Sequence, residues 1–368
     1  MNRTKPRNNK RIRILILVLA GLFLLLFVLP FSASVIAYES FFGKRYETVE
    51  WKKFSPEEFD GLERTQHTFV SDKGQRLVGY FYQVEGVEPR GIIVNAHGLG
   101  GGGHNDNMDY IAFFAHSGYP VFAFDATGND ESEGNGINGL SQGVIDLSYA
   151  ISFVEDSPEI PDLPIVLWGH SWGGYCVSAV LKHHPEVKAV IAVSGFDQST
   201  DLIKAQGKEL LGEISTVLVP YAKLYERIKL GKWAESTATA GFESSDAAIM
   251  IVQGGEDTVV PPEYGYVLWK AKYADDPRFT FIFRADRGHN DIYWSQEFID
   301  YLEGINNDLR KWVSGLDYDY SAKENETRFI AEKEAWIKQN LDRAVWCNGI
   351  DMPLFEQMLA FYDKAIGD

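Results

Sequence analysis

Ser171 lies in the segment Gly169-His-Ser-Trp-Gly173, which directly follows the apolar run Ile165–Trp168. A serine between two glycines, where a strand meets a helix, is held in a strained turn that exposes its hydroxyl. The following helix would direct its positive amino end towards this hydroxyl and favour a developing anion. The alternative is an ordinary glycine-rich surface turn. The strand–turn–helix context favours Ser171 as a nucleophile.

A serine hydroxyl is a weak nucleophile until a base takes its proton. His289 follows the apolar run Phe279–Phe283 and precedes a helical pattern, which would bring it back over the edge of a sheet. Asp257 follows an earlier apolar run, so the order serine, aspartate, histidine is that of one known triad arrangement. Asp197 is the second choice for the acid and Asp125 a weaker one. The acid would hold the histidine tautomer and stabilise the imidazolium.

A glycine-rich loop, Gly98-Leu-Gly-Gly-Gly-Gly103, follows another strand-like run that ends at His97. Acyl transfer needs two backbone N–H groups directed at the tetrahedral oxygen. We expect them from Leu99 and from Trp172, the residue after the nucleophile. No Lys-Ser/Thr pair follows the glycines, which excludes a phosphate-binding P-loop. We expect His97 to be structural.

Alternating apolar runs and helical patterns predict the elements that position these residues. A hairpin comes first, and the later strands are continuously apolar, as in parallel strands covered by helices on both faces. The expected fold is a doubly wound, mostly parallel, eight-stranded sheet. Its strands are His67–Ser71, Arg76–Gln83, Gly91–Asn95, Val121–Phe124, Ile165–Trp168, Ala189–Val193, Ala248–Val252 and Phe279–Phe283, and its helices are about 106–117, 141–156, 173–184, 262–275 and 291–304.

The pattern divides the chain into a main domain with additions. Residues 65–310 form the catalytic domain, and the stretch at about 197–247 is too long for an ordinary connection, which predicts a helical cap over the sheet. Residues 311–368 predict a C-terminal helical extension, to which the sequence assigns no function.

The N-terminal region predicts a membrane anchor. Residues 1–13 carry six basic residues, and the apolar stretch 14–37 has the roughly 20 residues that a span requires. Basic residues beside a span stay in the cytoplasm, so the domain beyond the connector 38–64 would lie outside it. The competing interpretation is a signal peptide cleaved near Ala37, followed by secretion. The length of the apolar run favours an uncleaved anchor.

Composition limits the classes of partner. The formal net charge is -17, which repels nucleic-acid phosphate, so we expect no nucleic-acid binding. The two cysteines, Cys176 and Cys347, cannot form a Cys-based zinc site, and we expect free thiols. Nothing in the sequence calls for a metal or an organic cofactor, and the oligomeric state stays open.

These motifs resemble the α/β-hydrolases of the serine aminopeptidase and monoacylglycerol-lipase-like group over about 65–305. The resemblance rests on four segments, which are His97-Gly98, the Ser171 turn, Gly254-Gly-Glu-Asp257 and Gly288-His-Asn290. The resemblance implies a triad of Ser171, Asp257 and His289 that cleaves small-molecule acyl esters through an acyl-enzyme, as carboxylesterases, lysophospholipases and monoacylglycerol lipases do.

Two alternatives remain, a serine peptidase with the same triad and an inactive, membrane-tethered binding protein. The sequence also departs from the group's usual Asp-x-Arg-Gly-x-Gly-x-Ser segment. Thr127 stands in place of the arginine and Asp130 in place of the second glycine. Because that segment shapes the wall of the site, the departure weakens the inference about the substrate and leaves the triad inference intact.

Overall fold

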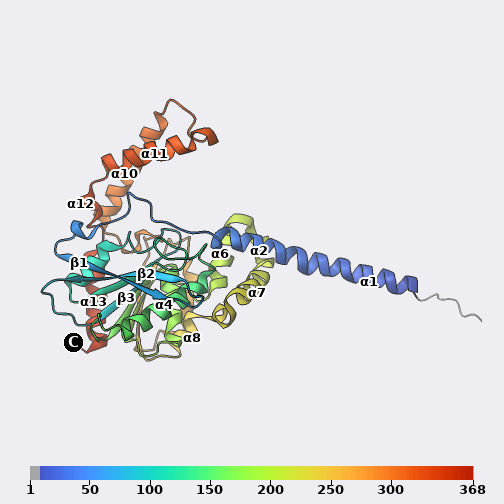
Figure 1. Ribbon diagram of the computed structural model, residues 1–368, viewed down its shortest axis with the longest axis horizontal. Coiled ribbons are helices and arrows are strands. Elements are labelled where there is room, and N and C mark those ends of the chain that lie inside the picture. Colours follow the sequence, from blue (N-terminus) through green and yellow to red (C-terminus); the bar gives the residue numbers. More distant parts are fainter. Residues whose placement is uncertain (1–8, 368) are drawn as a thin grey trace, which may run out of the picture.

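The computed structural model describes residues 9–367. They form one eight-stranded sheet in the order β1-β2-β4-β3-β5-β6-β7-β8, in which β2 runs antiparallel to both neighbours, β1 and β4, and all other pairs are parallel (Figure 1). The predicted fold is confirmed. The strands are β1 (Leu62–Val70), β2 (Arg76–Val84), β3 (Ile92–Ala96), β4 (Val121–Phe124), β5 (Ile165–His170), β6 (Ala189–Val193), β7 (Ala248–Gly254) and β8 (Phe279–Arg284).

Helices cover both faces of the sheet, which explains why the central strands are apolar on both sides. Every residue of β3, β4 and β6 is buried. One face packs against α4 (Leu140–Asp156), α5 (Trp172–Ala179) and α9 (Tyr266–Tyr273), and the other against α3 (Met108–His116) and α13 (Met352–Ile366). The carboxyl ends of the parallel strands therefore meet at one edge, where the loops carry the candidate site.

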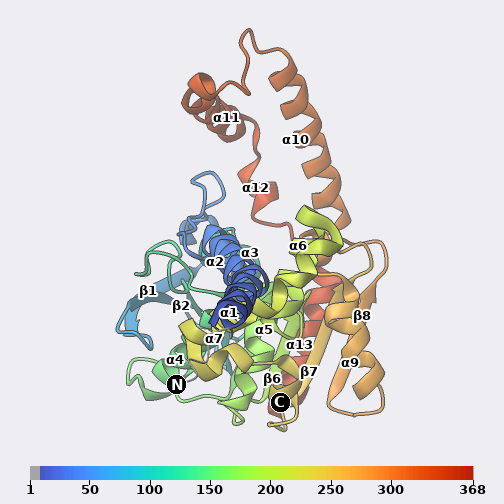
Figure 2. The same cartoon turned by 90° about the vertical axis from the view of Figure 1, so that its right-hand side faces the viewer.

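The last helix differs from the sequence expectation, which placed all of 311–368 in an extension. Phe355 and Tyr362 on α13 are fully buried, and the Tyr362 hydroxyl donates a hydrogen bond of 2.7 Å to the carbonyl of Leu167 in β5. Helix α13 thus completes a core layer. The part that protrudes is formed by α10 (Gln296–Ser314) and α11 (Glu326–Asn340) (Figure 2). The short helix α12 (Arg343–Trp346) links it back to the domain.

The insertion between β6 and β7 forms three helices. These are α6 (Ser199–Leu211), α7 (Val219–Leu230) and the short α8 (Ala238–Phe242). Helix α8 packs against α5, while α7 packs against the N-terminal helix. The insertion therefore connects the sheet to the N-terminal segment.

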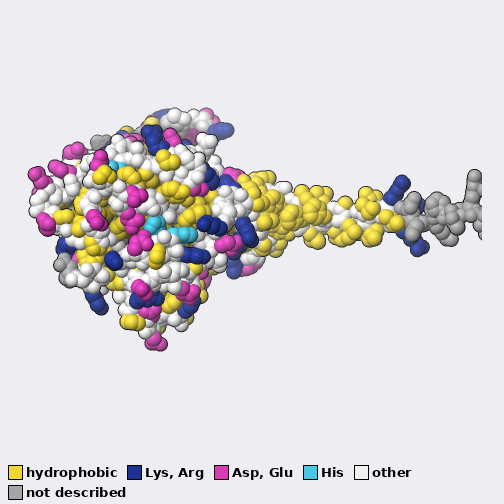
Figure 3. All heavy atoms as spheres, turned by 60° about the horizontal axis from the view of Figure 1, so that its bottom comes forward, with side chains coloured by type: hydrophobic (Ala, Val, Ile, Leu, Met, Phe, Trp, Pro, Cys, Tyr) yellow, Lys and Arg dark blue, Asp and Glu magenta, His cyan; other side chains and the backbone are white. Residues whose placement is uncertain are grey.

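The N-terminal segment is one continuous helix made of α1 (Asn9–Phe23), a π-helical stretch (Leu24–Val28) and α2 (Leu29–Phe42). Lys10–Phe42 is long and apolar enough to cross a membrane, and its apolar surface is exposed as it projects from the domain (Figure 3). The helix continues past Ala37, and Tyr38 and Phe42 are buried in the domain core. Part of the basic segment, residues 1–8, lies outside the described residues.

Candidate active site

Ser171 occupies a strained turn between β5 and α5. Its backbone has φ 59° and ψ -117°, and its N–H donates to the carbonyl of Val193 over 2.8 Å. A left-handed φ is costly for a residue with a side chain and persists only where the surroundings enforce it. The packing around Gly173 shows how tightly the turn is confined, because a Cβ there would lie 1.9 Å from the carbonyl oxygen of Ala96 on β3. The close approach of these backbones holds Ser171 at the strand edge.

The three residues proposed from the sequence meet in one hydrogen-bonded chain. His289 Nε2 lies 2.9 Å from Ser171 Oγ, and His289 Nδ1 lies 2.8 Å from Asp257 Oδ2. They come from the loops after β5, β7 and β8, which converge at the same edge of the sheet. This is the arrangement in which a base can take the serine proton while an acid orients the base.

The surroundings of Asp257 keep its carboxyl group ionised, as an acid that orients a histidine requires. Its Oδ1 accepts hydrogen bonds from the N–H groups of Val259 at 3.0 Å and Val260 at 2.8 Å. Burial by itself would raise the pKa of this carboxyl, but the hydrogen bond and charge of His289 and the backbone donors hold that pKa below its usual value. The carboxylate is therefore ionised at neutral pH.

The two alternative acids have other partners. Asp197 Oδ1 accepts from the N–H of Thr239 at 2.8 Å, from its hydroxyl at 2.6 Å and from Trp269 Nε1 at 3.2 Å. Asp125 pairs with the Nδ1 of His104 at 2.7 Å. The first carboxylate ties the start of the cap to α8 and α9, and the second lies under the glycine loop.

His170 is a residue of the pocket that the sequence analysis did not single out. Its Nε2 donates to the backbone carbonyl of His289 over 2.8 Å, and the two rings lie 4.7 Å apart between centroids. Burial, and next the neighbouring His289, lower the pKa of His170 to about 3, so it stays neutral. His170 therefore holds the loop that carries His289. Its direction depends on a loop 119 residues away, which local sequence does not reveal.

The glycine loop lies beside Ser171. A Cβ on Gly98 would be 3.8 Å from the Ser171 Cβ, Leu99 lines the same pocket, and Trp172 begins α5 directly after the turn. His97 orients this loop, as its Nδ1 donates to the Gly98 carbonyl at 2.8 Å and its Nε2 accepts from the N–H of Ala126 at 3.0 Å. Burial lowers the pKa of His97, in keeping with a neutral ring.

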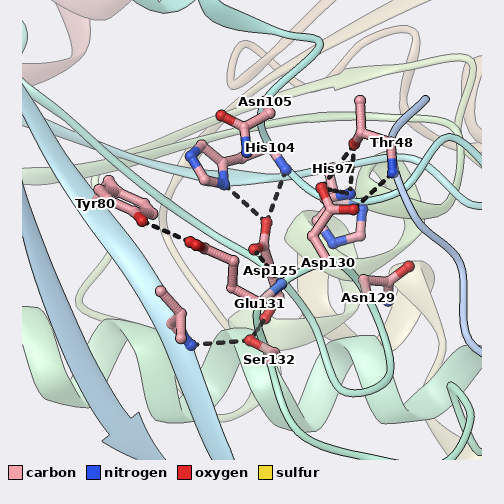
Figure 4. Close-up of polar contacts among 12 residues, drawn as sticks. Thr48, Tyr80, His97, His104, Asn105, Asp125, Asn129, Asp130, Glu131 and Ser132 are labelled. Atoms are coloured by element: carbon pink, nitrogen blue, oxygen red, sulfur yellow. Dashed lines mark hydrogen bonds and ion pairs between the residues drawn. The ribbon is translucent and has the colours of Figure 1, made fainter. Parts of the chain in front are cut away.

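Asp130, which departs from the family pattern, has a defined structural role (Figure 4). It adopts a φ of 32°, and its carboxylate accepts from the N–H of Gly103 at 2.9 Å and from the N–H and hydroxyl of Thr48 at 2.6 and 2.7 Å. The neighbouring His104–Asp125 pair fixes the end of the same loop, and a Cβ on Gly103 would lie 1.8 Å from Asp125 Oδ1. Asp130 therefore joins the glycine loop to the chain that leaves the N-terminal helix.

A pocket of about 680 Å³ opens over Ser171 and His289, a size typical of small-molecule sites. We group its lining residues by element into an apolar arm, from the cap and the N-terminal helix, and a polar and aromatic arm, from other elements. The first is lined by Ala37, Phe41, Leu202, Ile203, Leu218 and Ala222, and the second by Lys52, Asp106, Asn107, Asp109, Tyr293 and Trp346, among others.

Two carboxyl groups distinguish the polar arm. Burial raises the pKa of Asp106 to about 6 and that of Asp109 to about 7, and Lys52 opposes the shift at Asp106. Neither makes an ion pair within the part of the chain described here. Groups with shifted pKa values in a cleft are candidates for contact with a ligand.

One group of possible metal ligands occurs among residues 9–367, at the C-terminal part of α4. Glu155, His184 and Glu186 come together there, but both carboxylates are exposed. The His184 ring nitrogens bond to Ser148 and Glu186 at 2.8 Å each. This group lies outside the pocket and does not contribute to it.

Comparisons with known proteins show which proteins this chain is similar to. A profile of the family described as serine aminopeptidase matches residues 87–239. Monoacylglycerol lipase of Mycolicibacterium smegmatis is 30% identical over 135 residues, which are 36% of this chain and 46% of that protein. The chain is a member of the α/β-hydrolase superfamily. Its matched region is similar to a lipase of that superfamily.

Further relatives extend the comparison. Quorum-quenching protein AidA of Acinetobacter baumannii is 27% identical over 150 residues, 38% of this chain and 49% of that protein. The chain thus spans about half the length of these curated relatives. A solved esterase from Pyrococcus furiosus shares the fold with a TM-score of 0.54 at 17% identity, covering 73% of this chain and 96% of that one.

Proposed function

We propose that this protein is a membrane-tethered serine esterase that hydrolyses acyl esters through an acyl-enzyme on Ser171. The observation that carries the proposal is the chain of hydrogen bonds from Asp257 through His289 to Ser171 at a largely apolar pocket. A nucleophile, a base and an orienting acid in this geometry are the groups that acyl transfer requires.

In the proposed acylation step, Ser171 Oγ attacks the ester carbonyl carbon while His289 Nε2 takes the serine proton. The N–H groups of Leu99 and Trp172 would stabilise the oxyanion that forms. When the tetrahedral intermediate collapses, the bond to the alcohol breaks and His289 returns the proton to the leaving oxygen. Water, activated by the same histidine, then attacks the acyl-enzyme and releases the acid. All of these roles fall to groups of this chain.

The shape of the pocket supports an acyl substrate. Its apolar arm would bury an acyl chain, and burial of apolar surface is the main source of affinity for such a group. The polar arm would then face the alcohol. A small hydroxyl-bearing alcohol suits Asn107, Lys52 and the partly protonated Asp106 and Asp109.

A serine peptidase is the second candidate, and the same two carboxyl groups favour it. Once ionised, Asp106 and Asp109 would attract the ammonium group of a peptide N-terminus held in the polar arm. The two candidates differ in which bond is cleaved, so direct comparison of esters with aminoacyl amides separates them.

The test uses the full-length protein in detergent. A fluorophosphonate probe should label the parent protein and leave Ser171→Ala unlabelled, and p-nitrophenyl butyrate should be hydrolysed faster than aminoacyl p-nitroanilides. Faster cleavage of the anilides would favour the peptidase. Absence of labelling and of both activities would refute both candidates and favour a binding protein.

A further inference from the structure

The N-terminal helix continues from its exposed apolar part directly into the wall of the candidate active site. Ala37 and Phe41 on α2 line the same pocket as Ser171 and His289. Ser34, one turn before Tyr38, is buried and donates a hydrogen bond of 3.1 Å to the carbonyl of Leu218 in the cap. The segment that leaves the exposed helix is therefore built into the site.

The length of the helix places this wall at the edge of the bilayer. A hydrocarbon core of about 30 Å needs roughly 20 helical residues. Counted from Ile14, just beyond Arg13, such a span ends near Ala33. The first buried residue, Ser34, and the pocket residue Ala37 then lie where the helix leaves the membrane.

The tip of the cap reaches down beside the same helix. The Tyr221 hydroxyl donates to the carbonyl of Leu26, and its ring meets that of Phe27 edge-on at 5.9 Å. Leu26 lies about two turns below Ser34 on the exposed apolar part of the helix. Figure 1 shows α7 next to α2, on the side of the domain from which the N-terminal helix projects. The start of α7 consequently sits at the depth of the hydrocarbon.

The exposed surface of this tip carries large apolar side chains, beside one ion pair between Glu213 and Lys208. Ile214 and Val217, just before α7, are 75% and 60% exposed, and Ile228 on α7 is 65% exposed. In water these side chains would be an unfavourable patch. Beside a membrane span they continue its apolar surface, so the occupant that fits them is the acyl region of the same bilayer.

We infer that the membrane helix is itself part of the substrate site, and that an acyl ester resident in the bilayer passes sideways between α2 and the tip of the cap to reach Ser171. The inference rests on the proposed esterase activity and narrows its substrate to a long-chain ester presented by the membrane. It also requires an uncleaved helix, because a cut near Ala37 would detach Ser34 from the domain side of α2. Asp130 adds a fixed link, since it binds Thr48 after the helix and Gly103 in the glycine loop.

The first experiment tests the wall. Full-length protein is reconstituted in phosphatidylcholine vesicles, and kcat/KM is measured for p-nitrophenyl palmitate and p-nitrophenyl butyrate. Ala37→Trp should lower the palmitate-to-butyrate ratio at least tenfold, because a single methylene in a hydrophobic pocket can change specificity by about 10- to 200-fold. Ile36→Trp is the matched control, since Ile36 is 71% exposed and does not line the pocket. Equal ratios in the two variants would overturn the inference.

The second experiment tests the route. The double variant Ile214→Asp and Val217→Asp should lower hydrolysis of 1-oleoylglycerol in the vesicles at least tenfold and leave butyrate hydrolysis in solution within twofold. The matched control places the same charges at Val267 and Leu268, exposed apolar residues of α9, and should change neither rate. Unchanged oleoylglycerol hydrolysis in the cap variant would overturn the route from the bilayer.

Failure of the underlying activity has a different signature. If the parent protein hydrolysed neither ester and took no fluorophosphonate label, the proposed function would fail and this inference with it. Butyrate hydrolysis with no activity on vesicle-borne esters would leave the esterase standing and refute only the membrane route.

Discussion

Replacement of Asp257 by asparagine would reverse the hydrogen bond that orients His289. The Asp257 Oδ1 atom accepts two backbone N–H groups, from Val259 and Val260, so the asparagine carbonyl would keep that place. The amide nitrogen would then face His289 Nδ1, where Oδ2 accepted a hydrogen bond of 2.8 Å. The opposite rotamer would set the amide against two backbone donors and is unfavourable.

In this orientation the amide donates to Nδ1, and the imidazole proton moves to Nε2. His289 Nε2, which lies 2.9 Å from Ser171 Oγ, then presents a proton and cannot accept the one on the serine. A wrong histidine tautomer costs about 10⁴ in turnover in the Ser-His-Asp triad, roughly 5 kcal/mol of transition-state stabilisation. We expect a loss of this order with a nearly unchanged fold.

The assay is kcat for p-nitrophenyl butyrate, with thermal unfolding measured in parallel. Asp197→Asn is the matched control, because Asp197 also accepts three hydrogen bonds but contacts Thr239 and Trp269 instead of the base. It should retain most of the activity. A loss below tenfold for Asp257→Asn, or a larger loss for the control, would show that the orienting acid is not Asp257.

The other predictions concern the nucleophile, pH, the loop and topology. Ser171→Ala should lower hydrolysis by several orders of magnitude without lowering the unfolding temperature, which ester assays and calorimetry would show. Since burial raises the folded-state pKa of Asp109 from 3.8 to about 7, the folded protein binds more protons in that interval and loses stability as pH rises through it. Asp109→Asn should therefore raise the unfolding temperature at pH 8 more than at pH 4, and equal shifts would contradict this. Asp130→Ala removes the acceptor for Gly103 and Thr48 and so loosens the glycine loop. It should lower kcat for p-nitrophenyl butyrate several-fold and change KM less. Because we expect the domain to lie outside the cytoplasm, protease added to intact cells should digest a C-terminal tag. A protected tag would show that the domain is cytoplasmic. A tag in the medium would indicate cleavage near Ala37.

The sequence by itself determined the features that depend on local pattern. Continuous apolar runs between helical patterns are enough to predict the parallel strands, because buried strands need apolar residues on both faces. The turn at Ser171 is equally local, since glycine on both sides is what close backbone packing demands. The choice of Ser171, Asp257 and His289 was also local, because each lies shortly after the end of a predicted strand.

Only the tertiary structure decided how distant segments meet. His170 points to the carbonyl of His289 because two loops fold over one edge of the sheet, and α13 joins the core because Phe355 and Tyr362 fit against it. The sequence likewise separated the apolar helix from the catalytic domain, since hydropathy marks a span but not its neighbours. The contact of Ala37 and Phe41 with the pocket arises from packing of the helix against a cap more than 150 residues later, a relation that no local periodicity encodes.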